Sequence, residues 1–112
     1  MNHAARIEAL RAQLGGPRDG ALLRYSLGVA LLDHGEAAEA TTQLHAALEF
    51  DPGYSAAWKL LGKACLAAGD PDSATTAWRQ GIAVADAAGD VQAAKEMRVF
   101  LKRIEREGPG SD

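Results

Sequence analysis

The chain has 112 residues, of which 47% are hydrophobic and 24% are charged, a balance that fits one compact domain of ordinary globular composition. Its formal net charge of -3 argues against a nucleic-acid binder, which normally carries a basic domain or stripe. No apolar run approaches the roughly 20 residues that span a membrane, and the charged N-terminus lacks the apolar core of a secretory signal. We therefore expect a soluble cytoplasmic protein, and its single cysteine, Cys65, excludes an intrachain disulfide.

Six segments carry apolar residues at the spacing of an amphipathic helix, and the sequence offers no strand candidate. The expected helices cover residues 2–14, 19–34, 36–50, 54–68, 70–88 and 90–107. The predicted fold class is therefore all-α, with about six antiparallel helices joined by short turns. The tail over residues 108–112 has nothing to bury, and we expect it to be disordered.

Capping residues mark the boundaries of these helices. Asp19, Asp70 and Asp90 are the expected N-caps, because a carboxylate can accept hydrogen bonds from the free N–H groups of a first turn. Pro71 follows Asp70 and suits the first helical position. Three helices are expected to end at a glycine, namely Gly35, Gly69 and Gly89.

An internal repeat becomes visible when the sequence is compared with itself at a shift of 34 residues. Residues 21–54 then align with residues 55–88, and eight of the aligned pairs are identical. The identical pairs are Leu27/Leu61, Gly28/Gly62, Ala30/Ala64, Leu32/Leu66, Gly35/Gly69, Ala40/Ala74, Thr41/Thr75 and Thr42/Thr76. A repeat of this length indicates a stacked array of helical hairpins.

Gly28 and Gly62 fall inside predicted helices, where glycine costs ~1 kcal/mol relative to alanine. Some other interaction must offset that cost. We expect the partner helix to pack closely against the bare backbone at each glycine, with Ala40 and Ala74 as the small residues opposite.

Both copies resemble the tetratricopeptide repeat, which places a large residue and then Leu-Gly on its first helix and small residues around an aromatic residue on its second. The matching residues are Trp58, Leu61, Gly62, Ala74 and Trp78 in the second copy and Leu27, Gly28, Ala40, Ala47 and Pro52 in the first. Arg24 replaces the usual Trp, Leu31 and Cys65 replace the usual Tyr, and Asp86 stands where a proline would close the second copy. The resemblance implies a right-handed superhelix of α-hairpins.

Two repeats leave apolar faces exposed at both ends of a stack, and we expect the flanking helices to cover them. The N-terminal helix offers Ile7, Leu10 and Leu14. The C-terminal helix over 90–107 offers Val91, Ala94, Met97, Leu101 and Ile104. Because Lys95 and Glu96 fall where the repeat has Leu-Gly, we interpret this helix as a cap rather than a third copy.

The resemblance also implies a concave groove, lined by the first helix of each repeat, in which other polypeptides bind. The candidate peptide-groove residues are Leu22, Tyr25, Val29, Leu32, Lys59, Lys63 and Leu66. Lys59 and Lys63 share one helix face, so the groove would be half apolar and half basic, suited to an acidic or amphipathic segment of a partner. The alternative is that both lysines are ordinary solvated residues.

No pattern of catalytic or metal-binding residues stands out, and we expect neither enzymatic activity nor a bound cofactor or metal ion. His3, His34 and His45 match no metal-ligand spacing. Cys65 is predicted on the inward face of its helix, at a position that the family fills with a bulky residue, which is typical of a buried inert thiol.

The alternative function is a homo-oligomeric scaffold built through the terminal helices. Met97, Val99 and Phe100 cannot all face inward on one narrow stripe, so we expect some apolar surface to remain exposed. A nucleic-acid binder is favoured only by one basic side of the last helix, which glutamates dilute. We expect a protein or peptide partner, no nucleic acid, no membrane, and a monomer or weak homo-oligomer.

Overall fold

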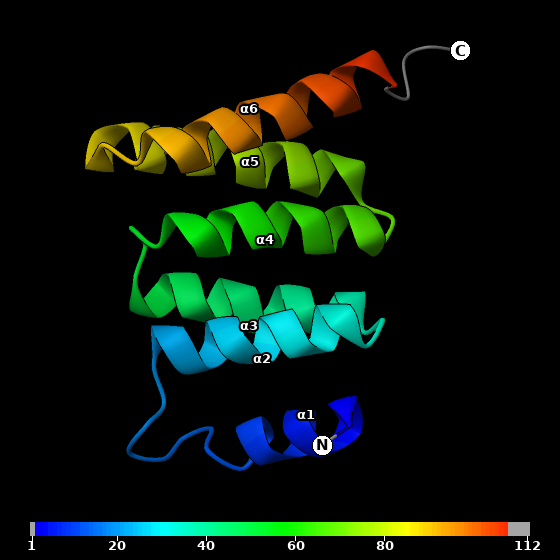
Figure 1. The fold of residues 1–112 in the computed structure, drawn as a ribbon, viewed down its shortest axis with the longest axis vertical. Helices are drawn as coiled ribbons and strands as arrows, with labels where there is room; N and C mark the ends of the chain where they lie inside the picture. Colours follow the sequence, from blue (N-terminus) through cyan, green and yellow to red (C-terminus); the bar gives the residue numbers. More distant parts are fainter. Residues whose placement is uncertain (1, 108–112) are drawn as a thin grey trace.

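The computed structural model describes residues 2–107 and contains six α-helices in that range (Figure 1). They are α1 (His3–Arg11), α2 (Ala21–Asp33), α3 (Ala37–Phe50), α4 (Ser55–Ala67), α5 (Pro71–Ala88) and α6 (Val91–Arg106). No strand occurs in this part of the chain, so the prediction of an all-α fold is confirmed. The tail for which we expected disorder lies outside the described residues.

The helices form two rows in a curved stack. In the inner row, α4 touches both α2 and α6, whereas in the outer row no Cα atom of α3 lies within 8 Å of one in α5. A stack whose inner helices are in contact while its outer helices are apart must be concave on the inner side. Figure 1 shows the stacking order, with α1 at one end and α6 at the other.

Local capping sets most of the helix ends as predicted. Asp70 accepts a hydrogen bond from the Ser73 backbone N–H at 3.1 Å, and Asp90 accepts one from Ala93 at the same distance. At the end of α4, Gly69 has a φ of +84°, and the next N–H donates back to the Cys65 carbonyl at 2.9 Å. This left-handed closure, which Gly35 and Gly89 repeat, explains why glycine stands at these positions.

Asp19 is not the N-cap of α2, and that prediction is wrong. Gly20 occupies the N-cap position, where no side chain makes a capping hydrogen bond. The Asp19 carboxylate instead accepts two hydrogen bonds from the Arg24 guanidinium and one from the Gly15 backbone N–H, each at 2.8 Å. These bonds, mainly those from Arg24, hold the pKa of Asp19 far below its usual range. Arg24 therefore ties down the loop before α2 instead of filling the core as a tryptophan would.

The first helix is shorter than predicted but packs as expected. α1 ends at Arg11 because the next turn tightens: the Leu14 N–H donates to the Arg11 carbonyl at 3.1 Å, and Gly15 then turns the chain with a φ of +78°. Ile7 is buried, and Leu10 and Leu14 pack against the core. The apolar face of α1 thus covers the first hairpin.

Glycines of the inner row accommodate large side chains of the outer row. A Cβ atom added at Gly28 would lie 2.8 Å from Leu44, and one added at Gly62 would lie 2.1 Å from the indole nitrogen of Trp78. Leu44 and Trp78 are the nearest neighbours of the glycines, so the prediction that the alanines four residues earlier lie opposite them is wrong. Close approach at both glycines is confirmed, and it explains why glycine is retained inside these helices.

α6 extends the inner row. It begins 36 residues after α4, because α5 has 18 residues where α3 has 14 and the following turn is shorter. At this shift Met97 aligns with Leu61, and both are fully buried. Val91, which we expected to cover the second repeat, is instead 75% exposed at the start of α6, and Ala93 is buried.

A further glycine contact, which the sequence analysis did not identify, fixes α6 to α5. A Cβ atom at Gly81 of α5 would lie 2.5 Å from the Met97 sulfur and 2.7 Å from the Trp58 Cβ. Trp58 also donates its indole N–H to the Pro52 carbonyl at 2.9 Å. The second hairpin and α6 therefore form one tightly packed unit.

Candidate peptide-binding groove

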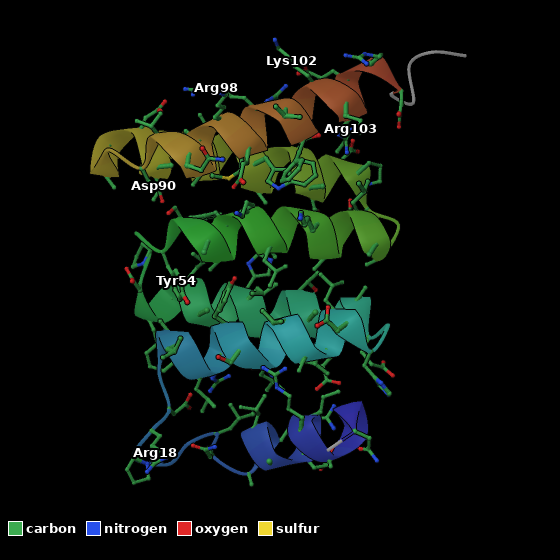
Figure 2. All side chains as sticks on the ribbon, viewed as in Figure 1. Arg18, Tyr54, Asp90, Arg98, Lys102 and Arg103 are labelled. Atoms are coloured by element: carbon green, nitrogen blue, oxygen red, sulfur yellow. The ribbon has the colours of Figure 1, made fainter. Side chains whose placement is uncertain are left out.

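The concave face is formed by the three inner-row helices, α2, α4 and α6. The predicted groove residues come from α2 and α4, and the contact between α4 and α6 adds side chains from α6 to the same face. Figure 2 shows Arg98 and Lys102 projecting outward from the end of the stack, whereas Arg103 points toward the neighbouring helices. α6 thus presents one basic side to solvent and another set of residues to the groove.

The predicted groove residues of α2 form an apolar strip. Leu22 is 70% exposed, and Tyr25, Val29 and Leu32 are half-buried. The Tyr25 ring packs against the ring of Tyr54, which precedes α4, with a centroid separation of 5.0 Å. Burial raises the pKa of the Tyr54 hydroxyl, which therefore stays neutral at physiological pH. This end of the groove is apolar and aromatic.

The two lysines of α4 have different surroundings. Lys59 donates a hydrogen bond to the Glu96 carboxylate of α6 at 2.7 Å, and this salt bridge lowers the pKa of Glu96. Lys63 is exposed, and its ammonium lies 4.9 Å from the centroid of the Phe100 ring, within the range of a cation–π contact. Because the charge of Lys59 is compensated, the basic part of the groove is smaller than predicted and centres on Lys63.

A pocket of about 410 Å³ opens between the C-terminal end of α4, the start of α5 and the C-terminal half of α6, within the size range of ligand sites. We refer to it as the α4–α6 pocket, and its lining residues are Lys63, Leu66, Pro71, Trp78, Phe100, Arg103, Ile104 and Glu107. Of the seven predicted groove residues, Lys63 and Leu66 are brought together here.

The sequence analysis missed the contribution of α6 to this pocket. Phe100, Arg103, Ile104 and Glu107 follow one another at intervals of three or four residues, which is the spacing of a single helix face. That face was available as a signal, but the 34-residue register placed α6 as a covering helix, and the groove was assigned to α2 and α4 alone.

Neither Cys65 nor the acidic residues provide an obvious reactive centre. Cys65 is 5% exposed, and burial raises the pKa of its thiol, which disfavours the reactive thiolate. In residues 2–107, no group of three or more His, Cys, Asp or Glu side chains is placed to hold a metal ion. None of the helices that the structure describes is long and apolar enough to cross a membrane.

The curved stack of helical hairpins defines a helical-repeat protein. The model of the tetratricopeptide-repeat family matches residues 31–98, and the chain belongs to that family, as its sequence predicts. A curated relative is TPR repeat-containing protein PA0015 of Pseudomonas aeruginosa, which is 52% identical over 100 residues that cover 89% of this chain and 95% of that protein. The solution structure of protein BPP2914 from Bordetella parapertussis is similar with a TM-score of 0.80 and 44% identity, over 96% of this chain and 90% of that one.

Proposed function

We propose that the protein is an interaction module that binds a segment of a partner protein along its concave face. Repeats of this family generally mediate contacts between proteins, which supports the class of function. The observation that carries the proposal is the asymmetry of the inner row, which has exposed apolar side chains on α2 and a pocket with basic residues between α4 and α6. An extended or helical segment with apolar and acidic residues fits such a surface.

In this proposal the predicted groove residues have two different roles. Leu22, Tyr25 and Val29 contact the partner at one end of the groove, and Lys63 and Leu66 contact it at the other. Leu32 lies between them and supports the strip from below, because it packs against the core. Lys59 keeps α6 against α4 through Glu96, and it therefore shapes the groove instead of binding the partner by its charge.

Photo-crosslinking in cells tests the proposal. A photoreactive amino acid is introduced at Leu22 or Tyr25 in the groove, and in matched variants at Thr42 or Gln80, which are exposed on α3 and α5. Groove binding requires that a partner is captured from positions 22 and 25 and not from positions 42 and 80. Capture from the outer-row positions alone would show that a different surface binds the partner.

The alternative is a homo-oligomeric scaffold that assembles through α6. The exposure of Val91 and Val99, at 75% and 49%, favours it. The exposed lysines and arginines of the same helix oppose it, because a symmetric contact would bring like charges together. Light scattering at high protein concentration distinguishes the two: the mass of one chain eliminates the scaffold, and a multiple of it that Val99→Lys abolishes supports it.

A further inference from the structure

We infer that the α4–α6 pocket binds one large apolar side chain of the partner, and that an acidic side chain lies next to it in the partner's sequence. The inference rests on the proposed function, since it names the kind of segment that the groove accepts. It depends on three features of the pocket: its apolar wall, its uncompensated basic residues and its position at one end of the concave face.

The wall of the pocket is suited to a hydrocarbon or aromatic group. Trp78 and Phe100 contact each other with a ring-centroid separation of 5.3 Å, and Leu66, Pro71 and Ile104 complete the apolar surface. The indole N–H of Trp78 already donates to the Lys59 carbonyl at 3.0 Å. Because the only polar atom of that ring is satisfied, an occupant needs no hydrogen bond to it, and an apolar group loses nothing by entering.

The charged residues of the pocket are not neutralised by the protein itself. In the described part of the chain, Lys63 and Arg103 have no carboxylate within 4.0 Å, unlike Lys59, Arg79 and Arg98, each of which pairs with an acidic residue. Glu107 also lines the pocket, so two positive charges face one negative charge. The surplus positive charge complements a carboxylate beside the bound apolar group.

The pocket is accessible from the groove. Lys63 and Leu66 belong both to the pocket and to the predicted peptide surface of α4, and Leu66 is 44% exposed. Figure 1 shows that the C-terminal half of α6 diverges from α5 on the side where the pocket lies. A segment that lies along α2 and α4 would therefore reach the pocket with one of its side chains.

Three short peptides with blocked ends test the inference: Gly-Glu-Phe-Glu-Gly, Gly-Glu-Ser-Glu-Gly and Gly-Lys-Phe-Lys-Gly. Binding is followed by NMR through the indole N–H signals of the protein's two tryptophans. At millimolar concentration the first peptide should shift the signal of Trp78 and leave that of Trp58, which does not line the pocket. The serine and lysine peptides should bind at least about tenfold more weakly.

Matched variants separate the pocket from the rest of the surface. Arg103→Glu should weaken the binding of the Glu-Phe-Glu peptide about tenfold, whereas Arg106→Glu, the same charge change at an exposed position outside the pocket, should not. Leu66→Glu should abolish the binding, and Leu22→Glu should preserve it. All four positions are exposed, and circular dichroism checks that each variant is folded.

Several outcomes would overturn the inference: no shift of Trp78 by the first peptide, equal binding of the lysine peptide, or equal effects of the two arginine variants. Tighter binding of free phenylacetate than of the peptide would assign the pocket to small molecules instead. The groove itself is tested separately, since crosslinks from positions 22 and 25 would preserve the proposed function even when the pocket proves empty of peptide.

Discussion

The indole of Trp78 occupies the space that a side chain at position 62 would need. A Cβ atom at Gly62 would lie 2.1 Å from its nitrogen, which donates to the Lys59 carbonyl on the same helix at 3.0 Å. The other side of the ring contacts Phe100 of α6. One outer-row residue thus links α4, α5 and α6, and it connects the packing of the repeat to the wall of the α4–α6 pocket.

Gly62→Ala should destabilise the protein by about 2 kcal/mol or more, because the overpacking cost exceeds the ~1 kcal/mol that alanine gains in a helix. Gly28→Ala should cost less, since its clashing atoms belong to the flexible side chain of Leu44 and lie at 2.8 Å. Urea unfolding measures both free energies. Gly20→Ala is the control, since no heavy atom lies within 4 Å of that Cβ position. An increase in stability of Gly62→Ala would contradict the close packing.

Cys65→Leu should stabilise the protein by about 1 kcal/mol, because the added carbons fill space that the thiol leaves open. Leu31 holds the equivalent position in the first repeat and is fully buried. A void of about 170 Å³ borders Cys65, lined also by His45, Trp58, Leu61, Ser73, Thr76 and Ala77. Thermal melting reports the change. Ala64→Val, at a fully buried position that does not line the void, should lower the melting temperature and so serves as the control.

The salt bridge between Asp19 and Arg24 predicts a loss of stability in acid. The folded state lowers the pKa of Asp19, so its contribution is complete above the unfolded-state value of about 4 and is lost as the pH falls below it. Asp19→Asn should therefore reduce stability at neutral pH and flatten its decline in acid. Unfolding free energies measured across this range check the slope. The exposed Asp33 forms no ion pair in the described structure, and Asp33→Asn should not flatten the decline.

The features that sequence analysis predicted correctly depend on residues close together in the chain. The caps at Asp70 and Asp90 need only the three following residues, and the glycine contacts recur at the same position of both repeats. The N-cap at Asp19 was wrong because Arg24, five residues later, competes for the same carboxylate. A local capping rule cannot weigh that competition, which depends on where the long arginine side chain lies after folding.

The pocket was not predictable for a different reason. Its residues come from three helices, and the position of α6 depends on the length of α5, which continues to Ala88 and moves α6 out of the 34-residue register. Only after this displacement does Met97 align with Leu61 and Glu96 come within reach of Lys59. Groove charge therefore could not be read from α4 alone, since the partner of Lys59 lies 37 residues away.

The salt bridge between Lys59 and Glu96 should hold α6 in place, and reversing either charge should loosen that helix. Lys59→Glu and Glu96→Lys should each raise the rate of amide hydrogen exchange in α6 a few-fold, on the scale of a partly exposed ion pair. The double variant, which restores opposite charges at 2.7 Å, should return the exchange rate toward that of the original protein.

Arg79→Glu is the matched control, because Arg79 and Glu105 also join α5 to α6 but are 3.5 Å apart and more than half exposed. That variant should leave exchange in α6 nearly unchanged. Added salt should reduce the difference between the Lys59 variant and the original protein, since screening weakens the pair. If the single variants exchange normally while the double variant does not, α6 is held by Gly81 and Met97 alone, and the groove does not depend on this ion pair.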